Sequence, residues 1–520
     1  MSTGKPFLLA ILSCSLLLTA CGGESGGAEC EELDSRCQAR RFLQVCTSGA
    51  WVTMEDCAAN GQSCVMNADG AECHGSGDTD TDTDTDTDTS TDTGTSTGSS
   101  GCGDRGRSGN VTIRTAADIA NIAGITQIGG SLTIHNTDLP DLSGLESLLC
   151  VMGNTKISSN PNPTDLSGLA NLHYVGGNLT ISDNSGLTSL TGLEHLDMVV
   201  RNCQIEDNDA MTSLAGLDGL RYIGKTSDTL RSELVINDND GLTDLSHLGA
   251  LELVEKIQIS NNGALASLSG MDSLAEFDDE LRIVQNNMLS DISDLGDCLA
   301  NTVSDIYIKG NPRLTDLTGL EVLTYVSGEL VIEDNLRLAS LTGLDNLEQA
   351  RTTLKVKGNA GLLDLTGLGA LTDVPGEGGG PVAEPGFIVE NNDSLVDLSG
   401  LALDSTVYLE ISGNGVLEDL EGADSLTSVG SVNIRNNAGL VGLDGLESLD
   451  SIGGDLDLFS NPELQSLAGL SGLTQLGENL YVVDNPKLPT CEAEELWARA
   501  HSGGSGTSTI SGNDDNATCP

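Results

Sequence analysis

One motif returns along most of this chain, and it restricts the possible fold more than any other feature of the sequence. Residues 178–196 read NLTISDNSGLTSLTGLEHL, and the same frame returns over residues 329–347. The frame's asparagine recurs at Asn160, Asn184, Asn208, Asn239, Asn262, Asn286, Asn311, Asn335, Asn359, Asn392, Asn414, Asn437, Asn461, Asn485 and Asn513. Most steps are 22 to 25 residues long, and the longer ones contain residues 224–232, residues 375–385 or the C-terminal end. Such self-similarity is typical of a solenoid with insertions in loops at one corner.

Each unit combines two short periodicities. Leu-x-Ile alternates with period two, which predicts a short strand with both apolar side chains on one face. The later leucines recur every third position, which suits a 3-10-like or extended side better than an α-helix. One unit cannot bury its apolar side chains alone, whereas stacked units can, with parallel strands ~4.8 Å apart. The sequence therefore predicts a mainly β fold, a right-handed parallel β-solenoid of about 15–16 coils and roughly 70–80 Å in length.

The frame asparagines are expected to point into this solenoid. A buried amide without partners costs roughly 1–3 kcal/mol, so each amide should bond to backbone groups of its turn and of the next coil. We interpret these asparagines as a structural ladder and not as catalytic residues.

Composition narrows the classes of function. The chain carries 23 Lys and Arg against 78 Asp and Glu, a formal net charge of −55, which argues against nucleic acid as a partner because phosphate would be repelled. A hydrophobic content of 38% is too high for a wholly disordered chain. Aromatic residues make up only 2%, which is unusual for a globular core but suits a narrow coil filled by Leu, Ile and Val.

The N-terminus predicts export and lipidation. Residues 1–20 contain Lys5 and then an apolar run too short to span a membrane, as in a signal peptide. The run ends in Leu-Thr-Ala before Cys21, which resembles the lipobox of bacterial lipoproteins; an ordinary signal peptide with a chance cysteine is the alternative. The resemblance implies cleavage before Cys21, lipidation of that residue and, because glycine follows it, an outer-membrane address. We therefore expect a lipid-anchored envelope protein, surface-exposed or periplasmic, with residues 21–29 as the anchored segment.

Residues 30–75 predict a small disulfide-rich module. One spacing, Cys-x6-Cys-x8-Cys, occurs twice in it, at Cys30, Cys37 and Cys46 and then at Cys57, Cys64 and Cys73. So short a segment buries too little core to be stable without cross-links, and an exported chain meets an oxidising compartment. Six cysteines allow fifteen pairings, so the connectivity stays open. Zinc is a weaker alternative because no C-x2-C pair is present.

Two acidic features of the sequence could bind calcium ions. Residues 76–101 are low in complexity, with Asp and Thr alternating at first, and predict an extended, solvated tether without the spacing of an EF-hand. Asp183, Asp207 and Asp238 each precede a frame asparagine in three successive coils. Stacked carboxylates repel one another unless they are solvated or bridged by Ca2+, and solvation is the preferred interpretation. No cofactor is expected.

The repeat resembles the leucine-rich-repeat-like L domains of insulin-type and EGF-type receptors and of fungal cell-wall proteins. The matching pattern is G-G-x-L-x-I-x-x-N-x-x-L-x-x-L-x-G-L, best seen over residues 176–193 and 453–470. The resemblance implies a solenoid of L-domain type over residues 102–490, with a cap over residues 491–520. It does not transfer the ligands of those receptors, because the chain has more coils than one receptor L domain. Internalin-like bacterial leucine-rich repeats are a near alternative.

Both ends of the solenoid are expected to be capped. Cys491 and Cys519 bracket the last coil and should form a disulfide, with a short helix over residues 492–500. Cys102 is expected to pair with Cys150 and to close the first coil.

Reactive side chains are few and scattered. The chain has no Gly-rich phosphate loop, no G-x-S-x-G and no H-E-x-x-H, so no enzyme is expected. Its six histidines are scattered, and three of them, His173, His195 and His247, occupy variable positions on the leucine-rich side and are expected at the surface. Cys203 and Cys298 lie some three coils apart, beyond the reach of a disulfide of roughly 7 Å, and should be free, buried thiols.

The outward positions of Leu-x-Ile-x predict a candidate binding face. Residues 102–520 contain 19 basic and 62 acidic residues, yet the basic and acidic residues at these outward positions are nearly equal in number. The face also holds three of the few aromatic residues, and side chains of these kinds are common in interfaces. Its candidate partner-binding residues are Arg282, Tyr307, Lys309, Lys355, Lys357, Arg435, Phe459 and Tyr481. A competing explanation for the small number of acidic residues on this face is that like charges are avoided on closely spaced strands.

Together these observations predict a non-enzymatic envelope lipoprotein that binds a protein or glycan partner through its sheet face, for adhesion, recognition or ligand capture. A structural spacer without a specific ligand is the main alternative. A β-helix polysaccharide lyase is a more distant one.

Overall fold

A computed structural model of the chain describes Cys102 and residues 105–519, apart from gaps at 138, 163–164, 225–230, 272, 275–276, 278, 297–298, 301, 377–385 and 502–505. Ahead of Cys102 it describes only the backbone of five strands. The chain divides into two compact units, Met1–Gly101 and Cys102–Pro520.

The first unit contains two small antiparallel sheets. β1 (Ser35–Gln38), β2 (Phe42–Thr47) and β3 (Ala50–Asp56) form one, and β4 (Gln62–Asn67) pairs with β5 (Gly70–Gly75) in the other. All five strands fall within the predicted disulfide module. The pairing of its six cysteines, the lipidation site Cys21 and the tether lie outside the described residues.

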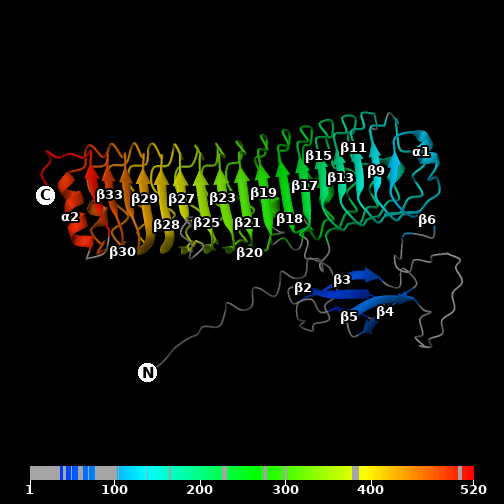
Figure 1. Cartoon of the computed structure of the whole chain (residues 1–520), viewed down its shortest axis with the longest axis horizontal. Helices are drawn as coiled ribbons and strands as arrows, with labels where there is room; N and C mark the ends of the chain where they lie inside the picture. The colour runs from blue at the N-terminus through cyan, green and yellow to red at the C-terminus, as the bar shows by residue number, and fades with distance from the viewer. Residues whose placement is uncertain are drawn as a thin grey trace, which may run out of the picture. The chain divides into compact units, whose positions relative to one another are not determined.

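The second unit is a parallel β-solenoid built on one long ladder (Figure 1). Its strands are β7 (Val111–Ile113), β9 (Leu132–His135), β11 (Thr155–Ser158), β13 (Leu179–Ser182), β15 (Cys203–Glu206), β17 (Glu233–Asn237), β18 (Lys256–Ser260), β19 (Glu280–Val284), β21 (Asp305–Lys309), β23 (Glu329–Glu333), β25 (Thr353–Lys357), β27 (Phe387–Glu390), β28 (Ser405–Ser412), β29 (Ser428–Arg435), β31 (Leu456–Phe459), β33 (Leu480–Val483) and β34 (Ser508–Ser511). Each pairs in parallel with the next, so seventeen strands make sixteen steps. The predicted mainly β solenoid and its number of coils are confirmed.

Shorter strands form a second set of parallel pairings, one corner earlier in each coil. They are β6 (Gly106–Arg107), β8 (Gln127–Ile128), β10 (Cys150–Val151), β12 (Tyr174–Val175), β14 (Met198–Val199) and β16 (Tyr222–Ile223), then β20 (Thr302–Val303), β22 (Tyr325–Val326), β24 (Gln349–Ala350), β26 (Asp373–Val374), β30 (Ser451–Ile452) and β32 (Gln475–Leu476). β28 and β29 are long enough to belong to both sets. The two predicted insertions fall in the sequence between a short strand and the next long one, β16 and β17 for the first and β26 and β27 for the second, and residues 225–230 and 377–385 within them lie outside the described residues.

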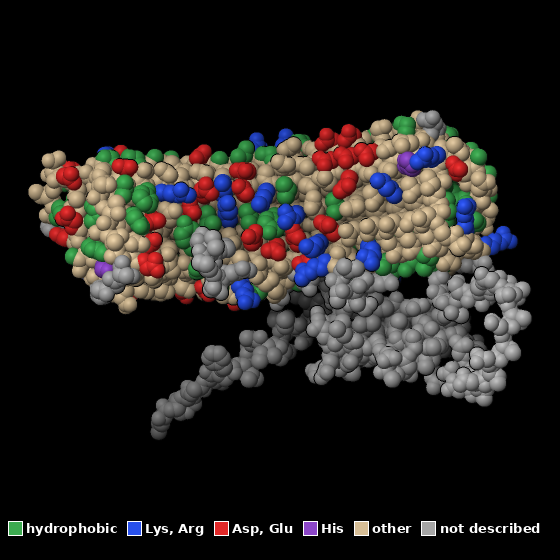
Figure 2. All heavy atoms as spheres, in the orientation of Figure 1, with side chains coloured by type: hydrophobic (Ala, Val, Ile, Leu, Met, Phe, Trp, Pro, Cys, Tyr) green, Lys and Arg blue, Asp and Glu red, His purple; other side chains and the backbone are tan. Residues whose placement is uncertain are grey.

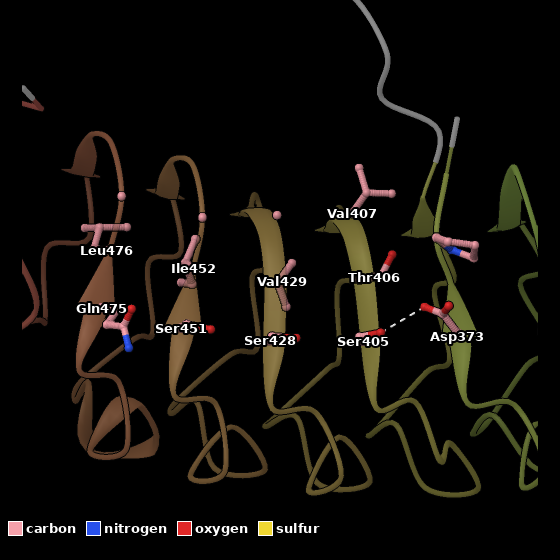
Figure 3. Close-up of a pocket in the computed structure, with 14 residues that line it drawn as sticks. Asp373, Ser405, Thr406, Val407, Ser428, Val429, Ser451, Ile452, Gln475 and Leu476 are labelled. Carbon is pink, nitrogen blue, oxygen red and sulfur yellow. Dashed lines mark hydrogen bonds between the residues drawn. The ribbon is translucent and has the colours of Figure 1, made fainter. Parts of the chain in front are cut away.

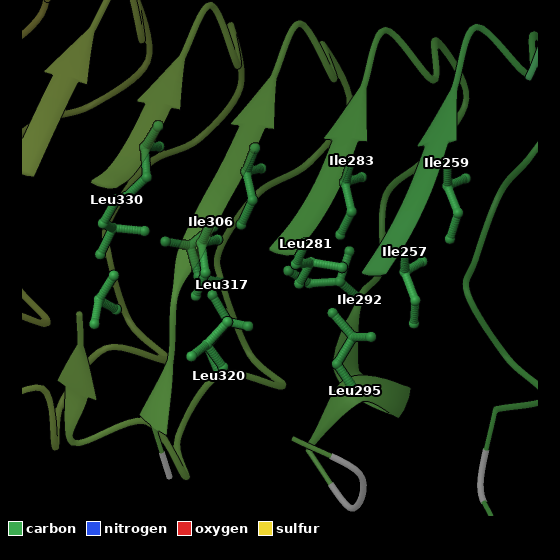
Figure 4. Close-up of a cluster of buried hydrophobic side chains, with 14 of the residues drawn as sticks. Ile257, Ile259, Leu281, Ile283, Ile292, Leu295, Ile306, Leu317, Leu320 and Leu330 are labelled. Atoms are coloured by element: carbon green, nitrogen blue, oxygen red, sulfur yellow. The ribbon is translucent and has the colours of Figure 1, made fainter. Parts of the chain in front are cut away.

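The alternation in each strand decides what is buried. In β21 the side chains of Ile306 and Ile308 are fully buried, whereas Tyr307 between them is only partly covered. The leucines at every third position close the coil from the other side, as Figure 4 shows for Leu317 and Leu320 beside Ile306. In the described residues, four of these leucine-rich turns contain 3-10 helices, η2 (Ser167–Leu169), η3 (Ser246–Leu248), η4 (Ser293–Leu295) and η5 (Ala468–Leu470). The 3-10-like side expected from the sequence is therefore present.

The frame asparagines form the predicted ladder. From Asn160 to Asn485 they are fully buried, and Thr137 occupies the position in the coil before them. In the middle of the ladder, Asn335 Nδ2 donates to the Ile308 carbonyl at 2.8 Å and to Asn359 Oδ1 at 3.3 Å. Asn335 Oδ1 accepts from the backbone and side-chain nitrogens of Asn311 at 3.0 and 3.3 Å. The Asn335 amide thus bonds to both neighbouring coils, and others, such as that of Asn311, also donate to a carbonyl of their own turn.

The residue just before each ladder asparagine adopts a left-handed backbone. Its φ is 56° at Asp183, 54° at Asp207, 53° at Asp238 and 64° at Gly310. Glycine, asparagine and aspartate tolerate this region better than other residues. The three stacked aspartates therefore have a conformational reason to occur at these positions, independent of any ligand.

Both ends of the solenoid carry the predicted disulfides. Cys102 is bonded to Cys150 and Cys491 to Cys519. The N-terminal coil also holds a short helix, α1 (Ala116–Ala120). The C-terminal helix, α2 (Thr490–Ala500), begins two residues earlier than predicted and buries Ala493, Leu496 and Ala500 against the last coils.

The two cysteines that were expected to be free differ in what the structure says of them. Cys203 is a buried free thiol, as predicted, and burial raises its pKa to about 12. Cys298 lies outside the described residues.

The cap disulfide gives a local prediction. Replacing both Cys491 and Cys519 by serine should destabilise the last coil by about 3 kcal/mol, since the bond closes a long loop of the unfolded chain. Hydrogen exchange should show reduced protection in β34 and α2 while the central strands keep theirs. Cys203→Ala serves as the control and should leave β34 unchanged. Equal protection of β34 in wild type and double variant would contradict the expectation.

No helix among the described residues is long and apolar enough to cross a membrane.

Candidate binding face on the parallel sheet

The outward side chains of the long ladder form one continuous surface, here called the sheet face. Lys, Arg, Asp and Glu side chains intermingle across its middle (Figure 2). All eight predicted partner-binding residues belong to this surface, because they alternate with buried residues on β19, β21, β25, β29, β31 and β33. The structure therefore brings the predicted residues onto one face, spread over nine successive coils.

In the middle of the face, basic side chains pack around Tyr307. The Arg282 guanidinium lies 4.2 Å from the centre of the Tyr307 ring and forms an ion pair with Glu280. Lys309 Nζ lies 5.0 Å from the centre of the same ring. The Tyr307 hydroxyl donates to Glu329 Oε2 at 2.9 Å, and burial followed by this hydrogen bond raises the pKa of Tyr307. Two cations thus lie close to this ring, and the Tyr307 hydroxyl stays protonated at neutral pH.

The neighbouring basic residues are paired with acids of the same face. Lys309 Nζ lies 3.5 Å from Glu333, and Lys357 Nζ lies 3.1 Å from Glu390 and 3.9 Å from Glu333. The hydrogen bond to Glu390 raises the pKa of Lys357. Within the described part of the chain, Lys355 forms no salt bridge. The sequence predicted balanced charges on this face, and the structure shows that most of them compensate one another directly.

Sequence reasoning missed one outward row of this face. Several long strands begin one residue before Leu-x-Ile, and that residue also points outward: Glu233, Lys256, Glu280, Asp305 and Glu329. This row has four acids and one base, so the face is more acidic than the sequence predicted. Lys256 and Arg282 bond to Glu280, and together they outweigh its burial and lower its pKa. The sequence could have predicted this row, because the period-two alternation of each strand continues for one residue before Leu-x-Ile.

Near the C-terminal end, the face carries a hydrogen-bonded chain of polar side chains. Arg435 Nη2 donates to Glu410 Oε1 at 2.6 Å, and the Tyr408 hydroxyl donates to Glu410 Oε2 at 3.3 Å. Asn433 Nδ2 donates to the Tyr408 hydroxyl oxygen at 3.2 Å. Burial raises the pKa of Glu410, but the hydrogen bonds from Arg435 and Ser412 outweigh it and the net pKa is lowered. Tyr408, a residue that sequence reasoning did not single out, connects this network.

Beside that network lie two aromatic rings and one carboxyl group. Asp457 stands in register between Asn433 on one side and Tyr481 on the other. Phe459 follows on the same strand, and its ring stacks on that of Tyr481 with centroids 6.1 Å apart and planes at 27°. Asp457 Oδ1 and Asn433 Oδ1 are both buried and have no hydrogen-bond donor among the residues that the structure describes. Burial, and then the charge of Asp455, raise the pKa of Asp457 to about 6.

This carboxyl group should make stability depend on pH. The folded state holds the Asp457 proton more tightly than the unfolded state, so its contribution to stability falls as pH rises from about 4 to about 6. Asp457→Asn should remove this slope and raise Tm above pH 6, as thermal scans between pH 4 and pH 8 would show. Asp484→Asn, on an exposed position one coil further, should follow the wild-type curve. Parallel curves for wild type and Asp457→Asn would contradict the expectation.

The acidic trio of the upstream coils lies at the end of the strands. Burial and then the charges of Asp238 and Asp183 raise the pKa of Asp207, so the three carboxylates are close enough to repel one another. Their oxygens are not among the donor atoms of the described residues that gather within 4.8 Å. Calcium binding here stays a prediction, and thermal unfolding with and without Ca2+ would test it.

The one gathered set of possible metal donors in the described residues is Cys102, Cys150 and His173. The two sulfurs are joined in a disulfide, so they are not thiolate ligands. His173 Nε2 lies 3.6 Å from Cys150 Sγ and packs against that bond.

A groove of about 730 Å³ crosses the coils of β28, β29, β30 and β32. Figure 3 shows its polar row, in which Ser405, Ser428, Ser451 and Gln475 follow one another in successive coils. Ser405 donates to Asp373 Oδ1 at 2.9 Å at one end of the row. Among the described residues that line the groove, Asp373 is the one titratable side chain, and serine hydroxyls and the Gln475 amide offer hydrogen bonds.

The fold and this face define a class, a leucine-rich-repeat-like parallel β-solenoid with disulfide-bonded ends. One solved structure that the chain matches is described as "Crystal structure of TLR13-ssRNA13 complex". The chain is 16% identical to it, the match covers 74% of this chain and 66% of that chain, and the TM-score is 0.28. A likeness this weak carries no functional argument. No protein-family model and no curated protein matches the chain.

Proposed function

We propose that this chain is a non-enzymatic lipoprotein of the cell envelope, with a solenoid of receptor L-domain type that binds a protein or glycan partner through its sheet face. Residues 1–20 would be removed on export, and Cys21 would carry the lipid that holds the protein at the outer membrane of a two-membrane bacterium. The disulfide module and the tether would then connect the anchor to the solenoid.

One observation carries this proposal. In a chain with only 2% aromatic residues, the sheet face holds Tyr307, Tyr408, Phe459 and Tyr481, packed with arginine, lysine and glutamate. The charges there are fixed by ion pairs and cation–π contacts, which leaves a preformed surface with little side-chain entropy to lose on binding. Avoidance of like charges would explain the mixed signs, but it gives no reason for the rings.

Binding to the envelope tests the proposal. Fluorescently labelled full-length protein should bind saturably to isolated envelope material or to intact cells. Replacing Arg282, Lys309, Lys355 and Lys357 by serine should lower that binding at least tenfold, because four cationic contacts are lost from the centre of the face. Tm should fall only slightly, since the ion pairs are partly exposed.

A variant with the same change of charge serves as the control. Arg313, Arg337, Arg351 and Lys487 are exposed and lie off the sheet face, and their joint replacement by serine should leave binding unchanged. An equal loss of envelope binding in both variants would show that binding depends on the net charge of the protein and not on the sheet face. Binding that survives the face variant, or wild-type binding that does not saturate, would favour the spacer without a ligand. Release of unsaturated products from acidic polysaccharides would favour the lyase.

A further inference from the structure

Two acceptor oxygens without donors lie next to each other on the sheet face. Asn433 and Asp457 are direct partners on neighbouring parallel strands, whose spacing is ~4.8 Å. Asn433 Oδ1 and Asp457 Oδ1 are buried, and neither has a donor within the described chain. Buried acceptors are normally satisfied, so two adjacent exceptions require an explanation.

The orientation of the Asn433 amide follows from its other contact. Its Nδ2 donates to the Tyr408 hydroxyl oxygen, while that hydroxyl donates its own proton to Glu410. A flipped amide would offer an oxygen to a hydroxyl whose proton is already engaged. Asn433 Oδ1 is therefore the atom left free, and the same network that fixes it also holds Arg435 against Glu410.

Two aromatic rings border these oxygens. Tyr481 stands opposite Asp457 in the next strand, and Phe459 lies two residues along on the same face as Asp457. Their stacked rings reduce access of water to the carboxyl group and leave apolar surface partly exposed beside it. The site thus combines an apolar platform with two acceptors that need donors.

We propose that Asn433, Asp457, Phe459 and Tyr481 form a binding site for an uncharged, hydroxyl-rich glycan. A sugar ring offers several O–H donors along its edge, which reach both buried oxygens once the bordering rings turn outward, and a C–H face that packs on those rings. An anionic ligand is disfavoured by Asp455, Asp457 and Glu410, and Arg435 is already paired. A cationic side chain would neutralise Asp457 but would leave the rings and the second acceptor unused. This inference rests on the proposed function of the sheet face and specifies one ligand class and one place on it.

Calorimetric titration of the full-length protein tests the site. The probes are the hexasaccharides of β-1,4-glucose, α-1,4-glucose, mannose and N-acetylglucosamine, with hexagalacturonate and hexalysine as charged counter-probes, all at pH 7.5. At least one neutral hexasaccharide should bind saturably. Asp457→Asn should weaken it at least tenfold, because the side-chain amide that it introduces would donate to Asn433 Oδ1 and close the site internally. Tyr481→Ala should also weaken binding at least tenfold through loss of the platform.

Two variants control for folding and for general loss of charge or ring. Glu333→Gln removes an acid from the middle of the same face, and Tyr174→Ala removes a ring from a short strand, so neither should change glycan affinity by more than twofold. Asp457→Asn preserves shape, and an unchanged far-ultraviolet circular dichroism spectrum would show that it folds. Failure of all four neutral probes, or equal binding by wild type and Asp457→Asn, would overturn the proposal. Binding of hexalysine that Asp457→Asn abolishes would overturn it in favour of a cationic peptide.

The two proposals can fail separately. Saturable envelope binding that persists in Asp457→Asn, without any glycan binding, would refute this site and leave the proposed function standing. Absence of both kinds of binding would refute both.

Discussion

Asn335→Ala should lower the free energy of unfolding by about 4 kcal/mol, one of the largest losses available to a single substitution in this chain. The amide is fully buried, and its removal breaks two bonds that Nδ2 donates, to Ile308 and Asn359. It also removes the Oδ1 that accepts from both Asn311 nitrogens, and the backbone nitrogen of Asn311 loses its partner. Urea unfolding followed by circular dichroism measures the loss.

An exposed asparagine provides the control for Asn335. Asn346 Nδ2 donates to the Glu321 carbonyl at 2.8 Å on the surface, so Asn346→Ala should cost less than about 1 kcal/mol. Because each coil contacts mainly its neighbours, Asn335→Ala should also reduce cooperativity and separate the unfolding of the two halves. Similar losses for both variants would show that the ladder does not hold the coils together.

Gly343→Ala should cost a similar amount, about 3–5 kcal/mol, for a different reason. Gly343 has φ 111°, and a Cβ there would overlap the Leu317 carbonyl oxygen of the preceding coil. That atom is backbone and cannot rotate away, so the two coils would have to separate. The same requirement recurs at Gly192, Gly216, Gly319, Gly367 and Gly422, which explains the glycine of the x-G-L repeat.

Gly415 is the matched control for Gly343. Its φ is not positive, and a Cβ built on it would meet no atom within 4 Å. Gly415→Ala should therefore change stability by less than about 1 kcal/mol, and the stiffer unfolded chain favours a small gain. The comparison needs only thermal or urea unfolding of the two variants. A loss at Gly415 as large as that at Gly343 would mean that close approach of the coils is not the cause.

The repeat predicted the fold well because its chemistry is local. Leu-x-Ile sets the strand, the third-position leucines set the opposite wall, and the asparagine sets the turn, all within one unit. Sequence reasoning missed the left-handed residue before the asparagine, although that position is always Gly, Asn, Asp, Ser or Gln. It also missed the outward residue that precedes Leu-x-Ile, since only the observed register shows that strands such as β19 begin there.

The candidate site was predictable only in outline. The alternation placed Arg282, Phe459 and Tyr481 on one face, and the structure confirms that placement. The pairing of acids with bases depends on the side-chain rotamers in neighbouring coils. The sequence does not specify these rotamers directly. The lack of donors at Asn433 and Asp457 could not be predicted from the sequence either. An oxygen can be recognised as unsatisfied only when the positions of all its neighbours are known.

The uniform register between coils has a consequence for how such a chain can change in length. Every internal step repeats the same strand pairing and the same asparagine bond, so a coil of about 24 residues is a unit that can be duplicated or deleted whole. A crossover between two similar coils in the gene would remove or add one strand spacing, ~4.8 Å, without leaving a donor or acceptor unpaired. Length in this protein is therefore an evolvable quantity that changes in discrete steps while the two disulfide-bonded ends stay the same.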